Sequence, residues 1–254
     1  MVLAIDIGNT NIAIGGFIGD ELAFVVRLST NPSLTSDEYA DKILGSLAVH
    51  GIEKRAVKGA IISSVVPPLN KIMKDAIRLL YGVEPLTVGP GIKTGINIHC
   101  DNPASVGSDL ICASAAANAL YGSPSLIVDM GTATKIIAVD SRGAFIGVSI
   151  IPGVLMGLRA LSSGTAQLPQ VSLEAPDSVI GKNTVDCMKS GVVYGNAALI
   201  DGMIDRFFAE LGGDVRVLAT GGLASAIIPY CRHEIKIDEH MVLRGLNILY
   251  KKNN

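Results

Sequence analysis

Short apolar runs separated by polar, glycine-bearing turns fill most of the chain, and longer segments of mixed character lie between them. Apolar runs of this length indicate strands, and the mixed segments indicate helices. The runs predict strands at residues 2–7, 12–18, 22–28, 59–63, 85–88, 135–139, 145–150 and 215–219. The mixed segments predict helices at residues 36–49, 67–80, 106–120, 184–211 and 239–251. Strands that alternate with helices are typical of an α/β fold.

The sequence predicts how the first two helices begin. Ser36 stands ahead of Asp37 and Glu38, so Ser36 is the expected N-cap of the first helix. Pro67 and Pro68 open the second helix, because proline is tolerated in a first helical turn.

The opening of the chain is repeated near its middle. Residues 126–132 line up with residues 3–9, so a strand is expected there as well, and two further strands follow each copy. The duplication predicts two similar halves, at residues 1–122 and 123–254. Because clefts between domains are common ligand sites, we expect a ligand to bind in a cleft between these halves.

Composition excludes several classes of function. Hydrophobic residues make up 49% of the chain and charged residues 17%, and the net charge of -2 offers no basic stripe for nucleic acid. The uncharged stretch at residues 110–128 is long enough to cross a bilayer, but polar, glycine and proline residues between 118 and 125 break it into a helix, a turn and a strand. No signal sequence is visible, and the four scattered cysteines form no metal or disulfide pattern. We therefore expect a soluble cytoplasmic protein with no membrane partner.

Two acidic turns carry the candidate chemistry. Residues 6–11 read Asp-Ile-Gly-Asn-Thr-Asn, and residues 129–134 read Asp-Met-Gly-Thr-Ala-Thr. The glycine permits a tight turn whose amide and hydroxyl groups can surround a phosphate, and Asp6 can hold a Mg²⁺ that bridges phosphate oxygens. The same residue types also form plain hairpin turns. Because such a turn ends the first strand of both halves, the sequence favours a nucleotide phosphate site.

Other motifs are less specific. Residues 220–224, Thr-Gly-Gly-Leu-Ala, follow a strand and open a helix, which suits close approach of a nucleotide or an ordinary turn. Residues 181–184, Gly-Lys-Asn-Thr, fail the P-loop pattern, and no GxGxxG is present. Asp109 lies in the first turn of a helix, where it either stabilises that helix or accepts a proton from a substrate hydroxyl during phosphoryl transfer. Spacing alone favours the first of these two roles.

Together these residues resemble the type III pantothenate kinase family, which belongs to the group of acetate and sugar kinases, Hsp70 and actin. The resemblance covers nearly the whole chain. Its motifs are residues 6–10, 63–67, 101–109, 129–134, 165–169, 180–184, 190–191 and 220–224, in the family's order.

The resemblance implies a duplicated ribonuclease H-like fold that binds ATP with Mg²⁺ between its halves and transfers the γ-phosphate to the primary hydroxyl of pantothenate, the first step of coenzyme A biosynthesis. It also implies a homodimer with the site near the subunit interface. Asp109 would accept the hydroxyl proton, Asp6 would hold Mg²⁺ through the phosphates, and Asp129 would bind a monovalent cation, K⁺ or NH₄⁺. The residues implied to contact ATP are Asp6, Ile7, Gly8, Asn9, Thr10, Asn11, Ile12, Ala13 and Thr132. Those implied to contact pantothenate are Gly107, Ser108, Asp109, Leu110 and Thr184.

Three positions depart from the family pattern. Leu110 stands where the family has Arg, Cys100 replaces a Tyr of the substrate pocket, and Lys135 replaces a Thr after the second turn. These positions leave two alternatives open: a kinase retuned to a related hydroxy acid, and a catalytically weakened member that acts as a nucleotide-binding regulatory or partner protein. The intact Asp6 and Asp109 favour the pantothenate kinase.

Overall fold

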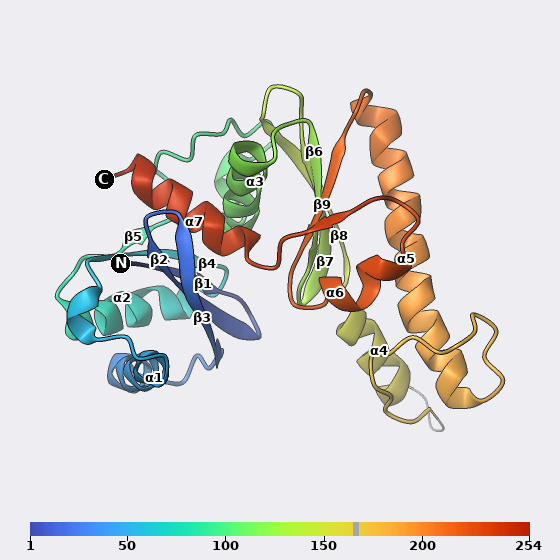
Figure 1. The fold of residues 1–254 in the computed structure, drawn as a ribbon, viewed down its shortest axis with the longest axis horizontal. Helices are drawn as coiled ribbons and strands as arrows, with labels where there is room; N and C mark the ends of the chain where they lie inside the picture. The colour runs from blue at the N-terminus through green and yellow to red at the C-terminus, as the bar shows by residue number, and fades with distance from the viewer. Residues whose placement is uncertain (165–167) are drawn as a thin grey trace. The chain divides into compact units, whose positions relative to one another are not determined.

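Each half of the chain folds around a five-stranded mixed sheet in the computed structural model, which describes residues 1–164 and 168–254 (Figure 1). The first sheet contains the antiparallel strands β1 (Val2–Ile7), β2 (Asn11–Ile18) and β3 (Glu21–Ser29), with β4 (Gly59–Ser64) and β5 (Leu86–Thr87) parallel to β1. The second contains the antiparallel strands β6 (Ser125–Met130), β7 (Ala133–Val139) and β8 (Phe145–Pro152), with β9 (Arg216–Thr220) and β10 (Lys236–Ile237) parallel to β6. The orders β3-β2-β1-β4-β5 and β8-β7-β6-β9-β10 are the same, which confirms the predicted duplicated ribonuclease H-like α/β fold.

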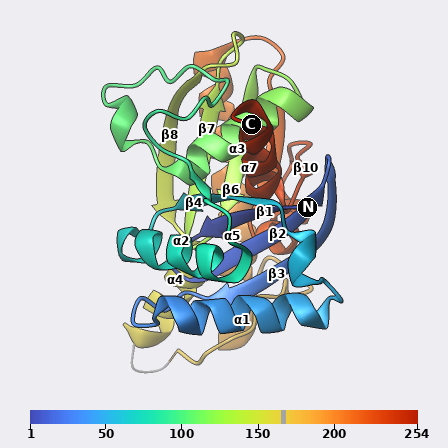
Figure 2. The same cartoon turned by 90° about the vertical axis from the view of Figure 1, so that its left-hand side faces the viewer.

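Helices cover both faces of the first sheet. α1 (Ser36–Val49) and α2 (Pro67–Tyr81) pack against each other and enclose an apolar core with alternate residues of β1, including Ile5 and Ile7. α7 (Met241–Lys252) lies against β1, β2 and β4 on the opposite face, as Figures 1 and 2 show. Because side chains alternate along a strand, Asp6 points to the face that α7 covers.

The first two helices start as the sequence predicts, with one correction. Thr35, not Ser36, is the N-cap of α1, because the amide of Glu38 donates to the Thr35 hydroxyl and the amide of Thr35 donates to the Glu38 carboxylate at 2.8 Å. This capping box satisfies two amide groups that a helix start leaves without partners. Pro67 opens α2 as predicted, and Gly82 ends it with a φ of 66°, which glycine adopts without strain.

In the second unit, α4 (Val154–Ser163), α5 (Thr184–Leu211) and the short α6 (Ala224–Ile227) enclose an apolar core with one face of the second sheet. The sequence pattern predicted α5 and a helix opened by residues 220–224, where α6 begins, but missed α4 and the two-residue β10. Gly157 in the middle of α4 lowers its helix propensity, and α6 is only a single turn. Three residues of the predicted motif at 165–169, namely 165–167, lie outside the described residues.

The uncharged stretch at residues 110–128 forms part of α3 (Ser108–Leu120), a turn and part of β6, as predicted. Within the described residues, no helix is both long enough and apolar enough to cross a membrane. Single 3₁₀ turns occur at Lys54–Ala56, Pro103–Ser105 and Ile228–Tyr230.

The chain divides into two compact units whose limits differ from the predicted ranges 1–122 and 123–254. The first unit comprises residues 1–97, 101–116 and 241–254, and the second comprises residues 98–100 and 117–240. The difference arises because α7 returns to the first sheet after the second has been completed. Asn247 Nδ2 donates to the carbonyl oxygen of Gly19 at 2.9 Å, and Lys251 Nζ lies 2.6 Å from Asp20 Oδ1.

Candidate functional site

The first acidic turn is held rigid by backbone hydrogen bonds. Ile7 and Ile12 are the innermost paired residues of β1 and β2, so residues 8–11 form the turn. The amide of Gly8 donates to the carbonyl oxygen of Asn11 at 3.0 Å, and a Cβ at position 8 would lie 3.1 Å from that oxygen. Thr30, just past β3, donates from its amide to Thr10 O at 3.0 Å and from its hydroxyl to Gly8 O at 2.6 Å. Sequence reasoning did not identify Thr30, which lies far from the turn in the chain.

A serine contact brings α3 to the end of the strand that carries Asp6. In the parallel pairing of β1 and β4, Asp6 lies beside Ser63. The hydroxyl oxygens of Ser63 and Ser108 are 2.9 Å apart, and the amide of Ser64 donates to Ser108 Oγ at 3.0 Å. These bonds fasten the N-terminus of α3 to the carboxyl end of β4. The next residue, Asp109, is therefore held at the same edge of the sheet as Asp6.

Asp6 and Asp109 both lie near enough to a buried thiol to influence its pKa. Burial raises the pKa of Cys112 well above its usual value, and the negative charges of Asp6 and Asp109 raise it further, whereas a hydrogen bond with Ser63 opposes the rise. The Cys112 side chain is completely buried. The sequence offered no signal for Cys112, which reads as an ordinary core residue.

Other residues at the start of α3 occupy defined positions. The amide of Leu110 donates to Asp109 Oδ1 at 2.9 Å, and a Cβ at Gly107 would lie 2.5 Å from the same carboxylate oxygen. Glycine at position 107 therefore leaves room for the carboxylate. The side chain of Leu110 is buried, and Ser108 uses its hydroxyl to hold the helix in place.

The second acidic turn differs from the first in length and charge. Met130 and Thr134 are the innermost paired residues, so the turn comprises residues 131–133 and is one residue shorter than the first. Asp129 pairs with Lys135 in the antiparallel register, and Asp129 Oδ2 lies 2.7 Å from Lys135 Nζ. The two side chains are only 12% and 18% exposed. At the corresponding position of the first copy, the residue opposite Asp6 is Ala13.

Two glycines pack directly on the second turn. A Cβ at Gly153, the N-cap of α4, would lie 2.1 Å from Thr132 O. A Cβ at Gly221, which has a φ of 91°, would lie 2.6 Å from the carbonyl carbon of Met130. Gly221 belongs to the predicted 220–224 motif, but the helix that follows has only four residues, so this glycine serves close packing of β9 against β6. Sequence reasoning did not identify Gly153.

The predicted substrate residue Thr184 is the exposed first residue of α5. Asn183 caps this helix, since its side-chain oxygen accepts from the amide of Asp186 at 2.9 Å. A Cβ at Gly181 would lie 2.4 Å from the amide nitrogen of Cys187, so this glycine lets the preceding loop lie on the first turn of α5. Cys100 is half-buried and belongs to the second unit.

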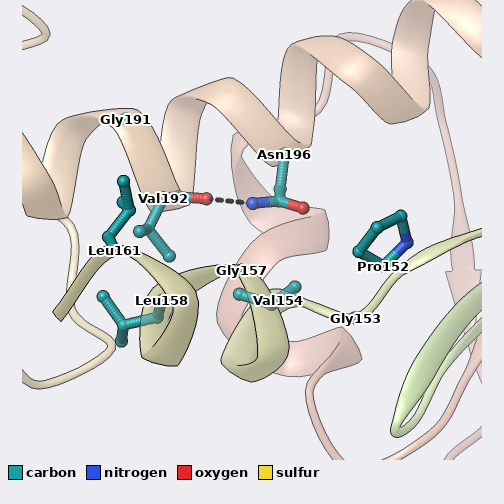
Figure 3. A pocket seen from close by; sticks show the side chains of 9 residues that line it. All are labelled: Pro152, Gly153, Val154, Gly157, Leu158, Leu161, Gly191, Val192 and Asn196. Atoms are coloured by element: carbon teal, nitrogen blue, oxygen red, sulfur yellow. Dashed lines mark hydrogen bonds between the residues drawn. The ribbon is translucent and has the colours of Figure 1, made fainter. Parts of the chain in front are cut away.

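A cavity of about 380 Å³ lies between α4 and α5 (Figure 3). Its lining residues are Pro152, Gly153, Val154, Gly157, Leu158, Leu161, Gly191, Val192 and Asn196. None of the nine carries a charge, and the Asn196 amide nitrogen donates to the carbonyl oxygen of Val192 at 2.6 Å. The cavity shares Gly153 with the support of the second turn. A lining without charge does not suit an acceptor carboxylate.

Solved structures share this fold at low sequence identity. Component A of the (R)-2-hydroxyglutaryl-CoA dehydratase of Acidaminococcus fermentans has a TM-score of 0.58 and 16% identity, with coverage of 99% of this chain and 98% of that chain. A ROK hexokinase from Thermus thermophilus has a TM-score of 0.50 and 14% identity, with coverage of 100% and 99%. At these identities the likeness shows the fold alone.

Sequence comparisons identify the family. The model of the type III pantothenate kinase family matches residues 2–206. A type III pantothenate kinase of Moorella thermoacetica is 42% identical over 254 residues, which cover 100% of both chains. One from a Geobacillus species is 41% identical over 253 residues, which cover 100% of this chain and 98% of the relative. The chain belongs to the type III pantothenate kinase family.

Proposed function

We propose that this chain transfers the γ-phosphate of ATP to the primary hydroxyl of pantothenate, the first step of coenzyme A biosynthesis. The observation that carries the proposal is full-length similarity, at 42% and 41% identity, to proteins named type III pantothenate kinase. Membership of a kinase family implies ATP and a divalent metal ion. The acidic turns and the placement of Asp109 give this activity a physical basis.

In the proposed site, the first turn, residues 6–13, binds the nucleotide phosphates, and Thr132 of the second turn contributes a further contact. The Gly8–Asn11 and Thr30 hydrogen bonds fix the first turn before any ligand arrives, so little ordering is needed on binding. Asp6 fits a Mg²⁺ ion carried by the phosphates, because Mg²⁺ prefers one or two carboxylates together with phosphates and water. When bound, the metal neutralises charge on the phosphates.

Asp109 is the proposed proton acceptor. The amide of Leu110 donates to one of its carboxylate oxygens, and the residue lies in the first turn of α3. As the acceptor oxygen forms its bond to the γ-phosphorus, the bond to the bridging oxygen of ADP breaks and the hydroxyl proton passes to Asp109. Asp6 and Asp109 both raise the pKa of Cys112, which supports a metal position and a base position at one edge of the first sheet.

Gly107, Ser108, Leu110 and Thr184 are the proposed contacts of the acceptor. Leu110 is buried and presents no charge, whereas the carboxylate of pantothenate needs a charged or multiply hydrogen-bonded partner when it leaves water. Recognition of that carboxylate therefore depends on a residue other than Leu110.

The monovalent cation that the resemblance places at Asp129 does not fit this chain. The ammonium group of Lys135 already lies 2.7 Å from the Asp129 carboxylate. A second cation at the same carboxylate would face a like charge at short range. No step of the proposed reaction depends on such an ion.

A homodimer through the helices of the second unit is part of the proposal. Exposed large apolar side chains gather on α4, on α5 and on the loop before α5, namely Leu155, Met156, Leu161, Val179, Ile180, Val185 and Leu199. A Cβ at Gly195 of α5 would meet no atom within 4 Å, so another helix can approach there. Exposed apolar patches of this kind mark protein interfaces.

Light scattering tests the dimer. The wild type should have twice the chain mass of 26.4 kDa, and Met156→Glu should shift it to a single chain. Leu79→Glu, an exposed apolar position on α2 of the first unit, is the control. A wild type of 26.4 kDa at micromolar concentration would count against the shared interface.

The activity is tested with Asp6→Asn in a coupled assay of ADP release with pantothenate. Turnover should be lost while the urea unfolding curve stays unchanged, because the substitution removes the charge that holds Mg²⁺ and keeps the shape. Asp20→Asn, an exposed acid of the same unit, should retain activity. Near-normal phosphorylation by Asp6→Asn would refute the first turn as the metal-phosphate site.

A further inference from the structure

The ion pair between Asp129 and Lys135 is fixed by the backbone. The two residues are direct cross-strand partners in the β6–β7 hairpin, one pair outside the turn, and their side chains lie on the same face of the sheet. Ile136 on the other face packs into the apolar core with α4 and α5, so the register cannot slip without moving that core residue to the opposite face. Lys135 is therefore held beside Asp129 by the same contacts that hold the hairpin.

The pair is largely removed from water. The Lys135 side chain is 18% exposed and that of Asp129 is 12% exposed, and their charged atoms are 2.7 Å apart. Charges in such surroundings interact more strongly than on an open surface, and separating them would leave each one poorly compensated. A K⁺ ion from solution would have to displace a tethered ammonium group or sit next to it against repulsion.

We propose that the Lys135 ammonium group permanently replaces the monovalent cation at Asp129, so that phosphoryl transfer by this chain requires neither K⁺ nor NH₄⁺. This inference rests on the proposed kinase function. A lysine side chain ends in the same –NH₃⁺ chemistry that a bound ammonium ion supplies, but it is attached covalently and needs no binding equilibrium. It brings one positive charge beside the second phosphate turn, where the negative phosphates of ATP are proposed to bind. The first copy has no equivalent across the strand, because Ala13 opposite Asp6 carries no charge.

The first experiment uses the wild-type chain. Steady-state ADP release and ATP affinity by calorimetry are measured in choline, sodium, potassium and ammonium chloride at equal ionic strength. We expect each quantity to vary by less than twofold between the salts. A tenfold or greater gain in either quantity with K⁺ or NH₄⁺ over choline would overturn the proposal.

The second experiment removes the tethered charge. Lys135→Thr should lower the rate in choline chloride at least tenfold, and K⁺ or NH₄⁺ should restore at least part of that loss and raise the melting temperature. Lys135→Met, which fills the space without charge or oxygen ligands, should show the loss but no rescue. Lys189→Met is the matched control, because the Lys189 side chain is also 18% exposed and forms an ion pair with Glu174. The rate of this variant should not depend on which salt is present. A Lys135→Thr variant that is folded and as active as the wild type in choline would contradict the proposal.

The outcomes separate this inference from the kinase assignment. If the wild type releases no ADP with pantothenate in any salt, the proposed function fails, and the calorimetric ATP affinity in the four salts still decides the role of Lys135. If Lys135→Thr does not fold, the wild-type salt series decides it alone.

Discussion

Replacing Gly153 by alanine should displace the second phosphate turn from the side of α4. The backbone of Gly153 has φ −65° and ψ 154°, which alanine adopts without strain. The added methyl carbon, however, would lie 2.1 Å from the carbonyl oxygen of Thr132 and 2.7 Å from its carbonyl carbon. These are backbone atoms that cannot rotate aside, so the turn and the start of α4 must move apart.

The size of the effect follows from the overlap. Methyl carbons essentially never approach other heavy atoms within 3.0 Å, so a shift of about 1 Å is required. Overpacking of this kind lowers the free energy of unfolding by about 1–3 kcal/mol. With Thr132 as a nucleotide contact, a displacement of about 1 Å in the turn lowers kcat/KM by up to roughly 100-fold.

The control for Gly153→Ala is Gly157→Ala, one turn further along α4. A Cβ at Gly157 would meet no atom within 4 Å, and alanine in a helix interior stabilises by about 0.5–1 kcal/mol relative to glycine. Urea unfolding should therefore give a lower free energy of unfolding for Gly153→Ala and a higher one for Gly157→Ala. In steady-state kinetics, only Gly153→Ala should lose kcat/KM for ATP. If Gly153→Ala matched the wild type in both measurements, the turn would not be supported by α4 in the way described.

Two further predictions concern the acceptor and alkaline pH. Leu110→Arg should raise kcat/KM for pantothenate about tenfold, chiefly through KM, because a guanidinium binds a carboxylate in the ground and transition states alike. An unchanged value in this variant, with Leu110→Met as the control, would rule out a missing carboxylate contact at position 110. Burial raises the pKa of the Cys231 thiol to about 12, and the charge of Asp201 adds to the rise. In the unfolded chain the thiol has an ordinary pKa of about 8.5, well below its pKa in the folded chain. The stabilising contribution of Cys231 is therefore fully present below about pH 8.5 and is lost as the pH rises towards 12. Urea titrations of Cys231→Ala should therefore show a smaller decline in unfolding free energy between about pH 9 and 11 than the wild type, and parallel declines would contradict this assignment.

Much of the fold was predictable because its signals are local. The two copies open with the same apolar strand and acidic turn, and each turn is followed by two strands joined by short glycine turns. The pairing of Asp129 with Lys135 is also local, since the two residues are placed symmetrically about the 131–133 turn. The strand order follows once these hairpins and the parallel crossovers are recognised.

The features that the sequence did not predict depend on contacts between segments that are distant in the chain. Nothing near Ser108 in the sequence reveals its contact with Ser63, which lies 45 residues earlier and brings Asp109 to the edge that carries Asp6. Likewise, nothing in the sequence singles out Gly153, and only the packing against Thr132 shows that a side chain cannot fit there. Periodicity predicts a face for each helix, but it does not say which sheet the face covers, so the return of α7 to the first sheet was not predicted.

In the sequence, most of the second unit lies between two segments of the first, and this sets the order in which the two units can finish folding. Residues 117–240 are continuous apart from a three-residue segment at 98–100, so the second unit can close its core as soon as those residues leave the ribosome. The first sheet is made earlier, yet the face that carries Asp6 waits for α7. At about 5–20 residues per second, the stretch from 117 to 254 takes roughly 7–28 s to translate. During that interval one face of β1, β2 and β4 lacks its helix, and the nascent chain offers a surface for chaperones or for misassembly with another chain. The unit that is translated first is thus the one that finishes folding last.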